Sequence, residues 1–222
     1  MVAQRLCVIV PALNEAAGIR AALQALAPLR SRGHEVIVVD GGSDDGTPQL
    51  AAGLCDRLLA APRGRALQMN AGARAARADA LLFLHADTRL PPLADLAVIE
   101  ALRARLWGRF DVRIEGRHPL LALVGWAMSL RSRLTGIATG DQAIFVRRAC
   151  FAGYPEIALM EDVALSRSLR RRGWPACLRL RVTTSGRRWE ARGVLRTILL
   201  MWRLRLAYAL GADPARLAER YR

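Results

Sequence analysis

Acidic side chains follow two apolar segments of the sequence, each with the length of a buried strand. Asp40 comes directly after the run EVIVV at residues 35–39, and Asp87 comes shortly after the run ALLFL at residues 80–84. Because the carboxyl ends of parallel strands lie at one edge of a sheet, where open α/β sheets bind ligands, we expect both carboxylates to face one ligand. Asp87 can hold a hard cation there, and the cation can hold a diphosphate.

Each acidic group also has a structural interpretation. Asp87 or Thr88 can cap a helix that begins after the Pro-Pro pair at residues 91–92. Glu161 and Asp162 stand at the start of another predicted helix, where two carboxylates complement the helix dipole. Local sequence alone does not separate chemistry from capping at these positions.

The composition is that of one folded domain with a large positive charge. The 222 residues are 53% hydrophobic and 24% charged, which excludes a disordered chain. A net charge of +15 favours nucleic acid or an anionic membrane surface, but all 34 basic residues are arginine, a bias that coding composition also produces. The absence of lysine excludes P-loop enzymes and Schiff-base enzymes.

The cysteines and histidines indicate neither a metal module nor a disulfide scaffold. Cys7, Cys55, Cys150 and Cys177 form no CxxC pair, and the three histidines are too scattered for a triad. Residues 1–10 resemble a strand and not a signal peptide, so we expect a cytoplasmic protein.

Strand and helix patterns alternate along the first half of the chain, which predicts a mostly parallel sheet with crossover helices. No GxGxxG motif follows any strand, so the dinucleotide-binding fingerprint is missing. We expect Asn14 to cap the first helix, and Ser43 or Asp44 to cap the short helix that runs to Leu50. The expected strands are residues 5–10, 35–39, 56–61, 80–84, 107–115, 140–147 and 178–184, and the longer helices are residues 15–29, 65–77, 93–105 and 161–172.

The chain ends in a helical extension, residues 190–222, which follows a domain expected at residues 1–189. Its segment 193–210 is amphipathic and contains Arg196, Arg203 and Arg205. Each arginine costs about 2.5–3.5 kcal/mol at a bilayer centre, so the segment does not span a membrane. Either it packs against the domain, or it lies in a membrane interface.

Six motifs together resemble the family 2 glycosyltransferases, which have the GT-A fold. The resemblance covers the chain from Leu6 to about Trp189 and is closest to a bacterial branch described as radical-SAM- or selenodomain-associated transferases. It implies an inverting, metal-dependent transfer of a hexosyl or related group from a nucleotide-diphosphate sugar to an acceptor hydroxyl. The motifs are VIVPALNE, VIVVDGGSDDGT, FLHADT, GDQAIF, MEDVAL and GRRW, in that order.

The resemblance assigns nucleotide-binding roles near the strand ends. Asp40 would accept hydrogen bonds from the base or the ribose, which suits a carboxylate because it accepts at both oxygens. Asp44 and Asp45 are expected to serve mainly as caps. The remaining residues expected to contact the nucleotide or its diphosphate are Pro11, Ala12, Asn14, Glu15, Arg63, Arg65 and Arg188.

The segment His85-Ala86-Asp87 occupies the place of the family's DXD motif, with His in place of the first Asp. The resemblance implies that Asp87 binds Mn²⁺ or Mg²⁺, which would neutralise charge on the leaving nucleotide. Three roles stay open for His85, namely binding the metal, binding ribose, or filling space.

Glu161 and Asp162 match the family's ED motif, in which the Asp is the general base on the acceptor hydroxyl. Residues 186–189 resemble the end of a QxxRW motif, but Ser185 stands where Gln is expected. The resemblance implies that Arg187 or Arg188 pairs with phosphate and that Trp189 lines the acceptor side. A solvated arginine pair with a core tryptophan is the alternative.

Two other function classes compete with the transferase. A basic protein that binds anionic lipid or nucleic acid accounts for the arginines but gives no reason for carboxylates at strand ends. A sugar-1-phosphate nucleotidyltransferase shares the sheet but usually has a Gly-rich basic loop, where this chain has PALNE at residues 11–15. The expected partners are a UDP- or GDP-linked sugar, an acceptor that is unknown and can be lipid-linked, and an anionic surface at the inner face of the cell membrane. Nucleic acid is not expected.

Overall fold

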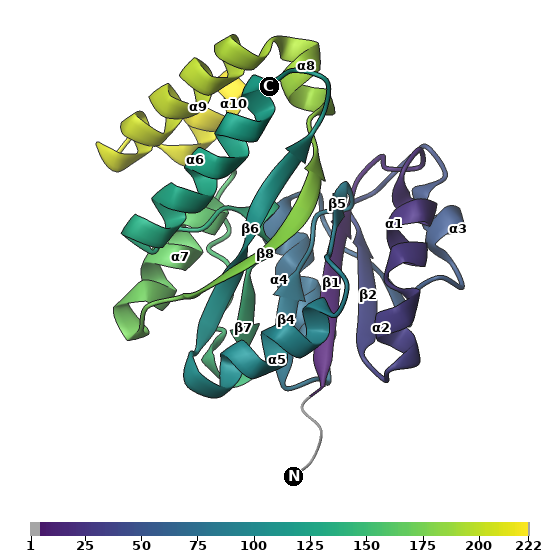
Figure 1. Ribbon diagram of the computed structural model, residues 1–222. Helices are drawn as coiled ribbons and strands as arrows, with labels where there is room; N and C mark the ends of the chain where they lie inside the picture. Colours follow the sequence, from purple (N-terminus) through teal and green to yellow (C-terminus); the bar gives the residue numbers. More distant parts are fainter. Residues whose placement is uncertain (1–4, 222) are drawn as a thin grey trace.

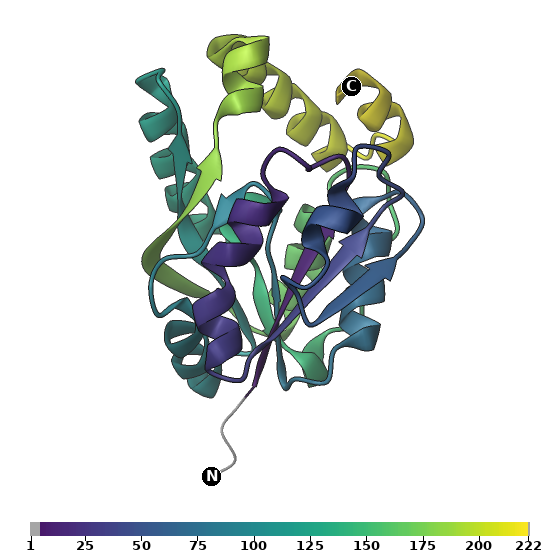
Figure 2. The same ribbon diagram turned by 90° about the vertical axis from the view of Figure 1, so that its right-hand side faces the viewer.

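The computed structural model describes residues 5–221 and shows an eight-stranded mixed sheet with helices on both faces (Figures 1 and 2). The strands are β1 (Leu6–Ala12), β2 (Glu35–Asp40), β3 (Arg57–Ala60), β4 (Ala80–Phe83), β5 (Thr88–Arg89), β6 (Trp107–Glu115), β7 (Phe145–Arg147) and β8 (Ala176–Ser185). Their order in the sheet is β3-β2-β1-β4-β7-β6-β8-β5. The expected ranges 1–10, 1–189 and 190–222 include residues 1–4 and 222, which lie outside the described part.

The pairing of the strands confirms a mixed and mostly parallel sheet. β1 is parallel to both β2 and β4, β2 is parallel to β3, and β6 is parallel to β8. β7 is antiparallel to β4 and β6, and the two-residue strand β5 is antiparallel to β8. Strands β1, β2 and β4 therefore end at one edge, as expected from the sequence.

Helices cover both faces of the sheet, because the central strands are apolar on both sides. They are α1 (Ile19–Ala25), α2 (Ala27–Ser31), α3 (Thr47–Ala51), α4 (Arg65–Ala75), α5 (Ala94–Ala104), α6 (Leu120–Thr135), α7 (Glu161–Arg172), α8 (Arg187–Arg192), α9 (Val194–Ala209) and α10 (Pro214–Tyr221), with short 3-10 turns η1 (Gly140–Gln142) and η2 (Arg148–Cys150). In β1, Val8 faces the core that contains residues of α1, α5 and α6, whereas Ile9 faces the core that contains residues of α4 and α7.

The C-terminal helices pack on the rest of the chain through a third, smaller apolar cluster. Leu204 of α9 and Leu217 of α10 are buried there with Met160 and Val163 of the α7 segment. Residues of α6 and α9 line one cavity together near the C-terminal ends of both helices, and the segment just before α6 lines a second cavity together with the first residues of α9. Among the described helices, none is long and apolar enough to cross a membrane.

Several local expectations are wrong. Residues 15–29 form two helices, which meet at Leu26, and Pro28 lies in the first turn of α2. Asn14 does not cap a helix, because α1 begins only at Ile19 after Gly18. The segment 140–147 was expected to be one strand, but only its last residues form a strand, β7, and its first three residues form the 3-10 turn η1.

The short helix α3 begins later than the sequence predicts. It starts at Thr47 after Gly46, whose φ of 85° lies in the left-handed region that glycine adopts readily. Ser43 and Asp44 are therefore not its caps. The domain boundary expected at residues 189/190 falls inside α8, which joins β8 to α9 without a linker.

Candidate functional site

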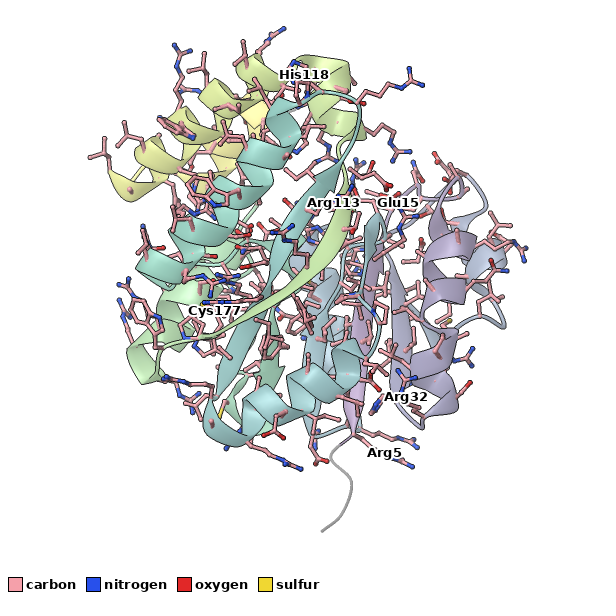
Figure 3. The ribbon with its side chains drawn as sticks, viewed as in Figure 1. Arg5, Glu15, Arg32, Arg113, His118 and Cys177 are labelled. Carbon is pink, nitrogen blue, oxygen red and sulfur yellow. The ribbon has the colours of Figure 1, made fainter. Side chains whose placement is uncertain are left out.

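Two loops at the carboxyl ends of β1 and β2 are held together by side-chain hydrogen bonds. The backbone N–H groups of Asn14, Glu15 and Ala16 donate to the side chains of Ser43 (2.9 Å), Thr47 (2.8 Å) and Asp45 (2.9 Å), respectively. Figure 3 shows Glu15 at this edge of the sheet, at the opposite end from Arg5 and Arg32. The two loops are thus fixed relative to each other, and Glu15 lies at the edge of the sheet where β1 and β2 end.

Asp40 is 7% exposed and is engaged by its own loop. One carboxylate oxygen accepts from the N–H groups of Gly42 (2.9 Å) and Ser43 (3.0 Å), and the other accepts from the Ser43 hydroxyl (2.5 Å). These bonds fold the segment after β2 into a turn. The expected role of Asp40 toward a base or ribose stays a prediction.

Gln68, a residue that sequence reasoning missed, ties the ends of β1 and β2 to α4. Its buried amide donates to the carbonyl oxygens of Ala12 (2.7 Å) and Val39 (2.9 Å). Pro11 and Ala12 are themselves buried in β1, whereas Arg63 is exposed on the loop before α4. Pro11 and Ala12 therefore shape the edge through their backbone, and the expected contact of Arg63 with the nucleotide stays a prediction.

Asp87 is placed by the pairing of β5 with β8. Thr88 lies opposite Thr184, their hydroxyls are 3.0 Å apart, and the N–H of Ser185 donates to the carbonyl oxygen of Asp87 (3.2 Å). This brings residues 185–188 beside Asp87. The capping alternative is wrong, because α5 begins at Ala94 and no side chain caps it.

His85 contacts the carboxylate of Asp141, a residue whose importance the sequence did not reveal. The imidazole Nδ1 lies 3.3 Å from a carboxylate oxygen of Asp141. Burial alone would raise the pKa of Asp141, but the bond to His85 and the charge of Arg65 outweigh it and hold this pKa below its usual value. A Cβ on Gly140 would lie 2.5 Å from the imidazole, so the close approach requires glycine.

Glu161 and Asp162 begin α7 on the other side of η1. The carboxylate of Asp162 accepts from the N–H of Gly140 (2.9 Å) and from its neighbour Val163 (2.7 Å). Glu161 is 7% exposed, and burial, followed by the charge of Asp162, raises its pKa. The carboxylate of Asp162 is thus oriented by backbone groups while that of Glu161 is buried.

Arginines balance these carboxylates. Burial alone would lower the pKa of Arg65, but the carboxylates of Glu161 and Asp141 outweigh it and raise this pKa. At Glu15, burial and the charge of Asp87 raise the pKa against Arg187 and Arg188, and the Arg187 guanidinium lies 4.0 Å from its carboxylate. The edge therefore carries interleaved charges of both signs.

The GRRW segment divides between the site and the core. Arg188 is exposed and donates to the hydroxyl of Tyr221 (2.9 Å). Its positive charge favours the ionised forms of Glu15 and Asp141 and so acts to lower the pKa of each. Trp189 is half-buried and packs against the main hydrophobic core, which favours the alternative of a core tryptophan. Its expected role on the acceptor side stays a prediction.

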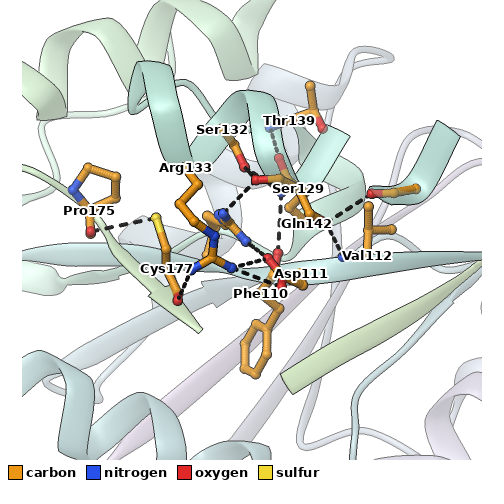
Figure 4. A network of polar contacts seen from close by, with 12 residues as sticks. Phe110, Asp111, Val112, Ser129, Ser132, Arg133, Thr139, Gln142, Pro175 and Cys177 are labelled. Atoms are coloured by element: carbon orange, nitrogen blue, oxygen red, sulfur yellow. Dashed lines mark hydrogen bonds and ion pairs between the residues drawn. The ribbon is translucent and has the colours of Figure 1, made fainter. Parts of the chain in front are cut away.

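A buried polar network under α6 fixes η1, and with it Asp141 (Figure 4). Gln142 is fully buried and donates to the hydroxyl of Ser132 (2.9 Å) and the carbonyl oxygen of Phe110 (3.3 Å). Nearby, both carboxylate oxygens of Asp111 accept from Nη2 of Arg133, at 2.8 and 2.9 Å. Such satisfied networks hold a loop in one position.

The carboxylate of Asp87 is open to a divalent cation at this edge. Its side chain is exposed and its one hydrogen bond is a long one of 3.4 Å from Thr88, whereas Asp40 and Asp141 are engaged by neighbours. Within residues 5–221, no three acidic, histidine or cysteine side chains converge to make a complete metal site. One carboxylate plus substrate phosphates is a donor set typical of Mg²⁺.

The family follows from the sequence match. The sequence model of Glycosyl transferase family 2 matches residues 7–158. The chain belongs to this family. A comparison with curated proteins found no match.

Solved structures of glycosyltransferases share the fold of this family member. The mannosyltransferase PcManGT from Pyrobaculum calidifontis, in complex with GDP-Man and Mn²⁺, is 21% identical, with a TM-score of 0.66 over 98% of this chain and 69% of its own. Glucosyl-3-phosphoglycerate synthase from Mycobacterium tuberculosis, with Mn²⁺, UDP and its product, is 19% identical, with a TM-score of 0.59 over 82% and 71%. S. aureus TarS 1-349 with UDP-GlcNAc is 20% identical, with a TM-score of 0.63 over 82% and 58%. The chain spans between 58% and 71% of the length of these structures, and the likeness establishes the GT-A fold.

Proposed function

We propose that this family 2 glycosyltransferase is an inverting, metal-dependent enzyme that uses a nucleoside-diphosphate sugar. The observation that carries the proposal is the meeting of three acidic segments at one sheet edge. His85, two residues before Asp87, contacts Asp141, and the N–H of Gly140 beside Asp141 donates to Asp162. Arg65 and Arg188 both interact with the charge of Asp141. A diphosphate next to a general base requires this pairing of cationic and anionic groups.

Asp162 is the proposed general base. The backbone N–H groups of Gly140 and Val163 hold its carboxylate, which leaves lone pairs for an acceptor hydroxyl. The hydroxyl loses its proton to Asp162 as its oxygen attacks the anomeric carbon, and the bond to the diphosphate breaks on the opposite face. Attack opposite the leaving group inverts the configuration.

Asp87 is the proposed ligand of Mn²⁺ or Mg²⁺, together with the diphosphate oxygens. When bound, the cation supplies charge neutralisation for the leaving nucleoside diphosphate. Arg65 and Arg188 add donors for the same phosphates, since guanidinium groups bind phosphate through paired N–H bonds. His85 positions Asp141 through its Nδ1 atom.

The test of the donor site is calorimetric titration with UDP and GDP in the presence of Mn²⁺. Saturable binding of one of them is expected, and Asp87→Ala should weaken it by at least about tenfold, as loss of a charge-assisted contact does. Asp162→Asn should bind the same nucleotide like the wild type but abolish transfer. Absence of nucleotide binding in the wild type, or unchanged binding in Asp87→Ala, overturns the proposal.

A second proposal concerns the outer faces of α6 and α9, which expose apolar stripes at helical spacing. On α9 the stripe is Leu195, Leu199, Trp202 and Leu206, and on α6 it is Leu123, Trp126, Leu130 and Leu134, with Trp202 72% exposed. The arginines at 196 and 203 on α9 are also exposed. We infer that these stripes dock on an anionic membrane surface, because leucine and tryptophan beside arginine are typical of interfacial helices.

Sedimentation with vesicles of phosphatidylglycerol and phosphatidylcholine tests this docking. The double variant Leu199→Gln/Trp202→Gln should lose vesicle binding without losing thermal stability, because both side chains are exposed. Leu96→Gln is the matched control, since Leu96 is 52% exposed on α5, away from α6 and α9 (Figure 1). Equal sedimentation of all three proteins contradicts the proposal.

A further inference from the structure

A small cavity lined by three arginines lies between α6, α7 and α9. It has a volume of about 190 Å³, and its lining includes the side chains of Arg131, Arg167 and Arg205. Met160 and Val163 also line it, so the cavity lies directly against the turn that carries Asp162. The three arginines come from three different helices, and all of them line this one cavity.

Arg131 is not satisfied by the protein. Its Nε and Nη2 atoms are both buried and have no hydrogen-bond partner. A buried unpaired donor is costly, so each such group in a folded protein needs an explanation, and an ion or water that binds there is the usual one. Water alone does not neutralise a guanidinium group.

Carboxylates offset the positive charge around the cavity only in part. Burial lowers the pKa of Arg131 to about 10, and the positive charge of Arg205 adds to the effect. Burial also lowers the pKa of Arg205, with Asp162 opposing and Arg167 reinforcing this shift. Asp162 and Asp141 act against this shift at Arg131, and the carboxylate of Asp162 also accepts hydrogen bonds from the backbone N–H groups of Gly140 and Val163.

The third arginine is held in place by an aromatic ring. The Arg167 guanidinium lies 5.1 Å from the centre of the Tyr208 ring, and Tyr208 itself lines the cavity. Stacking on a ring orients the N–H fork of a guanidinium without using its hydrogen bonds. Arg167 is therefore free to bind an anion in the cavity.

We propose that this cavity binds a phosphoryl group of the acceptor, with Arg131, Arg167 and Arg205 as its ligands. A phosphate supplies enough acceptor oxygens and negative charge for all three guanidinium groups. Since the cavity adjoins the turn of Asp162, an acceptor anchored there by its phosphate presents a nearby hydroxyl to the base. In this last step the inference rests on the proposed transferase function, whereas the anion site itself does not.

Calorimetric titration with inorganic phosphate tests the site. It is performed with the nucleoside diphosphate and cation bound, so that the donor site is filled. The wild type should bind phosphate saturably, and Arg131→Met and Arg205→Met should each weaken the affinity by at least about tenfold. Arg20→Met, an exposed charge on α1, should leave it unchanged. Equal affinity in the wild type and both cavity variants overturns the site.

Thermal melting separates binding from a structural role. Because two nitrogens of Arg131 have no partner, Arg131→Met should melt at the same or a higher temperature than the wild type, and phosphate should raise the melting temperature of the wild type alone. A lower melting temperature with unchanged phosphate affinity assigns Arg131 to structure and overturns the proposal.

Two phosphate sources are distinguished with glycerol phosphate and with phosphatidylcholine vesicles that contain phosphatidate. Saturation by glycerol phosphate assigns a soluble acceptor. Binding that requires phosphatidate in the vesicle and is lost in Arg131→Met assigns a lipid headgroup. If phosphate titrates normally but no nucleoside diphosphate binds the wild type, the transferase proposal fails and the anion site stands.

Discussion

Gly140 lies where the imidazole of His85 leaves no room for a side chain. We expect Gly140→Ala to lower the free energy of unfolding by about 1–3 kcal/mol, the usual effect of overpacking, and to lower transfer by displacing the N–H that holds Asp162. Urea unfolding measures the loss. The control is Gly18→Ala, where an added Cβ meets nothing within 4 Å and stability should be preserved. Equal stability of the two variants would show that His85 moves aside freely.

Glu161 gives the stability a pH dependence. Because burial raises its pKa above the ordinary value of 4.5, the folded state favours the protonated acid, and its ionisation destabilises the fold as the pH rises through the raised pKa. Glu161→Gln removes this penalty. We expect the variant to melt at a higher temperature than the wild type at pH 8, and the difference to disappear below pH 4.5.

The comparison in thermal melts should be made without divalent cations, with Glu100→Gln as a control. Glu100 is exposed and pairs only with Arg103 at 2.8 Å, so its removal should change the melting temperature little at any pH. A Glu161→Gln variant that is less stable than the wild type at pH 8 would instead show that the charge of Arg65 dominates.

Individual site residues were predictable where they follow an apolar strand. Asp87 is visible in the sequence because the buried run before it fixes its place at the sheet edge. Asp141 is not, because its position depends on a 3-10 turn whose packing is set by Gln142, far from any periodic pattern. Gln68 and Arg131 lie on helices among other polar residues, and only tertiary contacts distinguish them from surface groups.

At the scale of elements, α6 is fastened to the sheet through buried charge as well as apolar contact. Arg109 is fully buried, pairs with Asp111, and donates to the carbonyl oxygen of Ser129 on α6 at 2.9 Å. Asp111 also binds Arg133 of α6. This arrangement positions the helix that contributes Arg131 to the cavity.

Asp111→Asn should therefore be strongly destabilising. It leaves the Arg109 guanidinium buried without a counter-charge, and breaking such a pair costs about 3–5 kcal/mol. Urea unfolding measures this loss, and Asp79→Asn on the exposed turn before β4 should stay within about 0.5 kcal/mol of the wild type. A loss for Asp111→Asn no larger than that of the control would mean that water reaches Arg109.

The elements were predictable in proportion to their apolar pattern. The runs that became β1, β2 and β4 are apolar on both faces, so their positions follow from the sequence with errors of one or two residues. The division of the expected first helix into α1 and α2 was not predictable, because the backbone hydrogen-bond pattern breaks at Leu26 although the apolar residues keep their helical spacing across it. The segment 140–147 is apolar only at its end. Its polar start forms a 3-10 turn whose residues contact His85 and Asp162.

At the scale of the whole molecule, the C-terminal helices have two different faces. One face of α9 contributes Leu204 to the cluster with Met160 and Val163, next to the turn that carries Asp162, while the other exposes the apolar stripe. The sequence left packing and membrane docking as alternatives for this segment. The structure shows that one face of α9 packs on the rest of the chain, and the exposed stripe on its other face is the surface that we propose docks on a membrane.

Because the packed face of α9 touches α7, we expect the extension to unfold together with the sheet domain in one transition. Leu204→Ala should lower the free energy of unfolding by about 2–5 kcal/mol, as large-to-small substitutions in a core do. Leu206→Ala, two residues away and 63% exposed, is the matched control and should have little effect. Tryptophan fluorescence and circular dichroism of the same urea titration should give one midpoint, because the buried Trp107 and the α9 residue Trp202 then report the same unfolding transition. Leu204→Ala should shift the midpoint equally in both measurements. Two separated midpoints, with the variant moving only the lower one, would show instead that the extension unfolds independently and that its contacts do not stabilise the turn that carries Asp162.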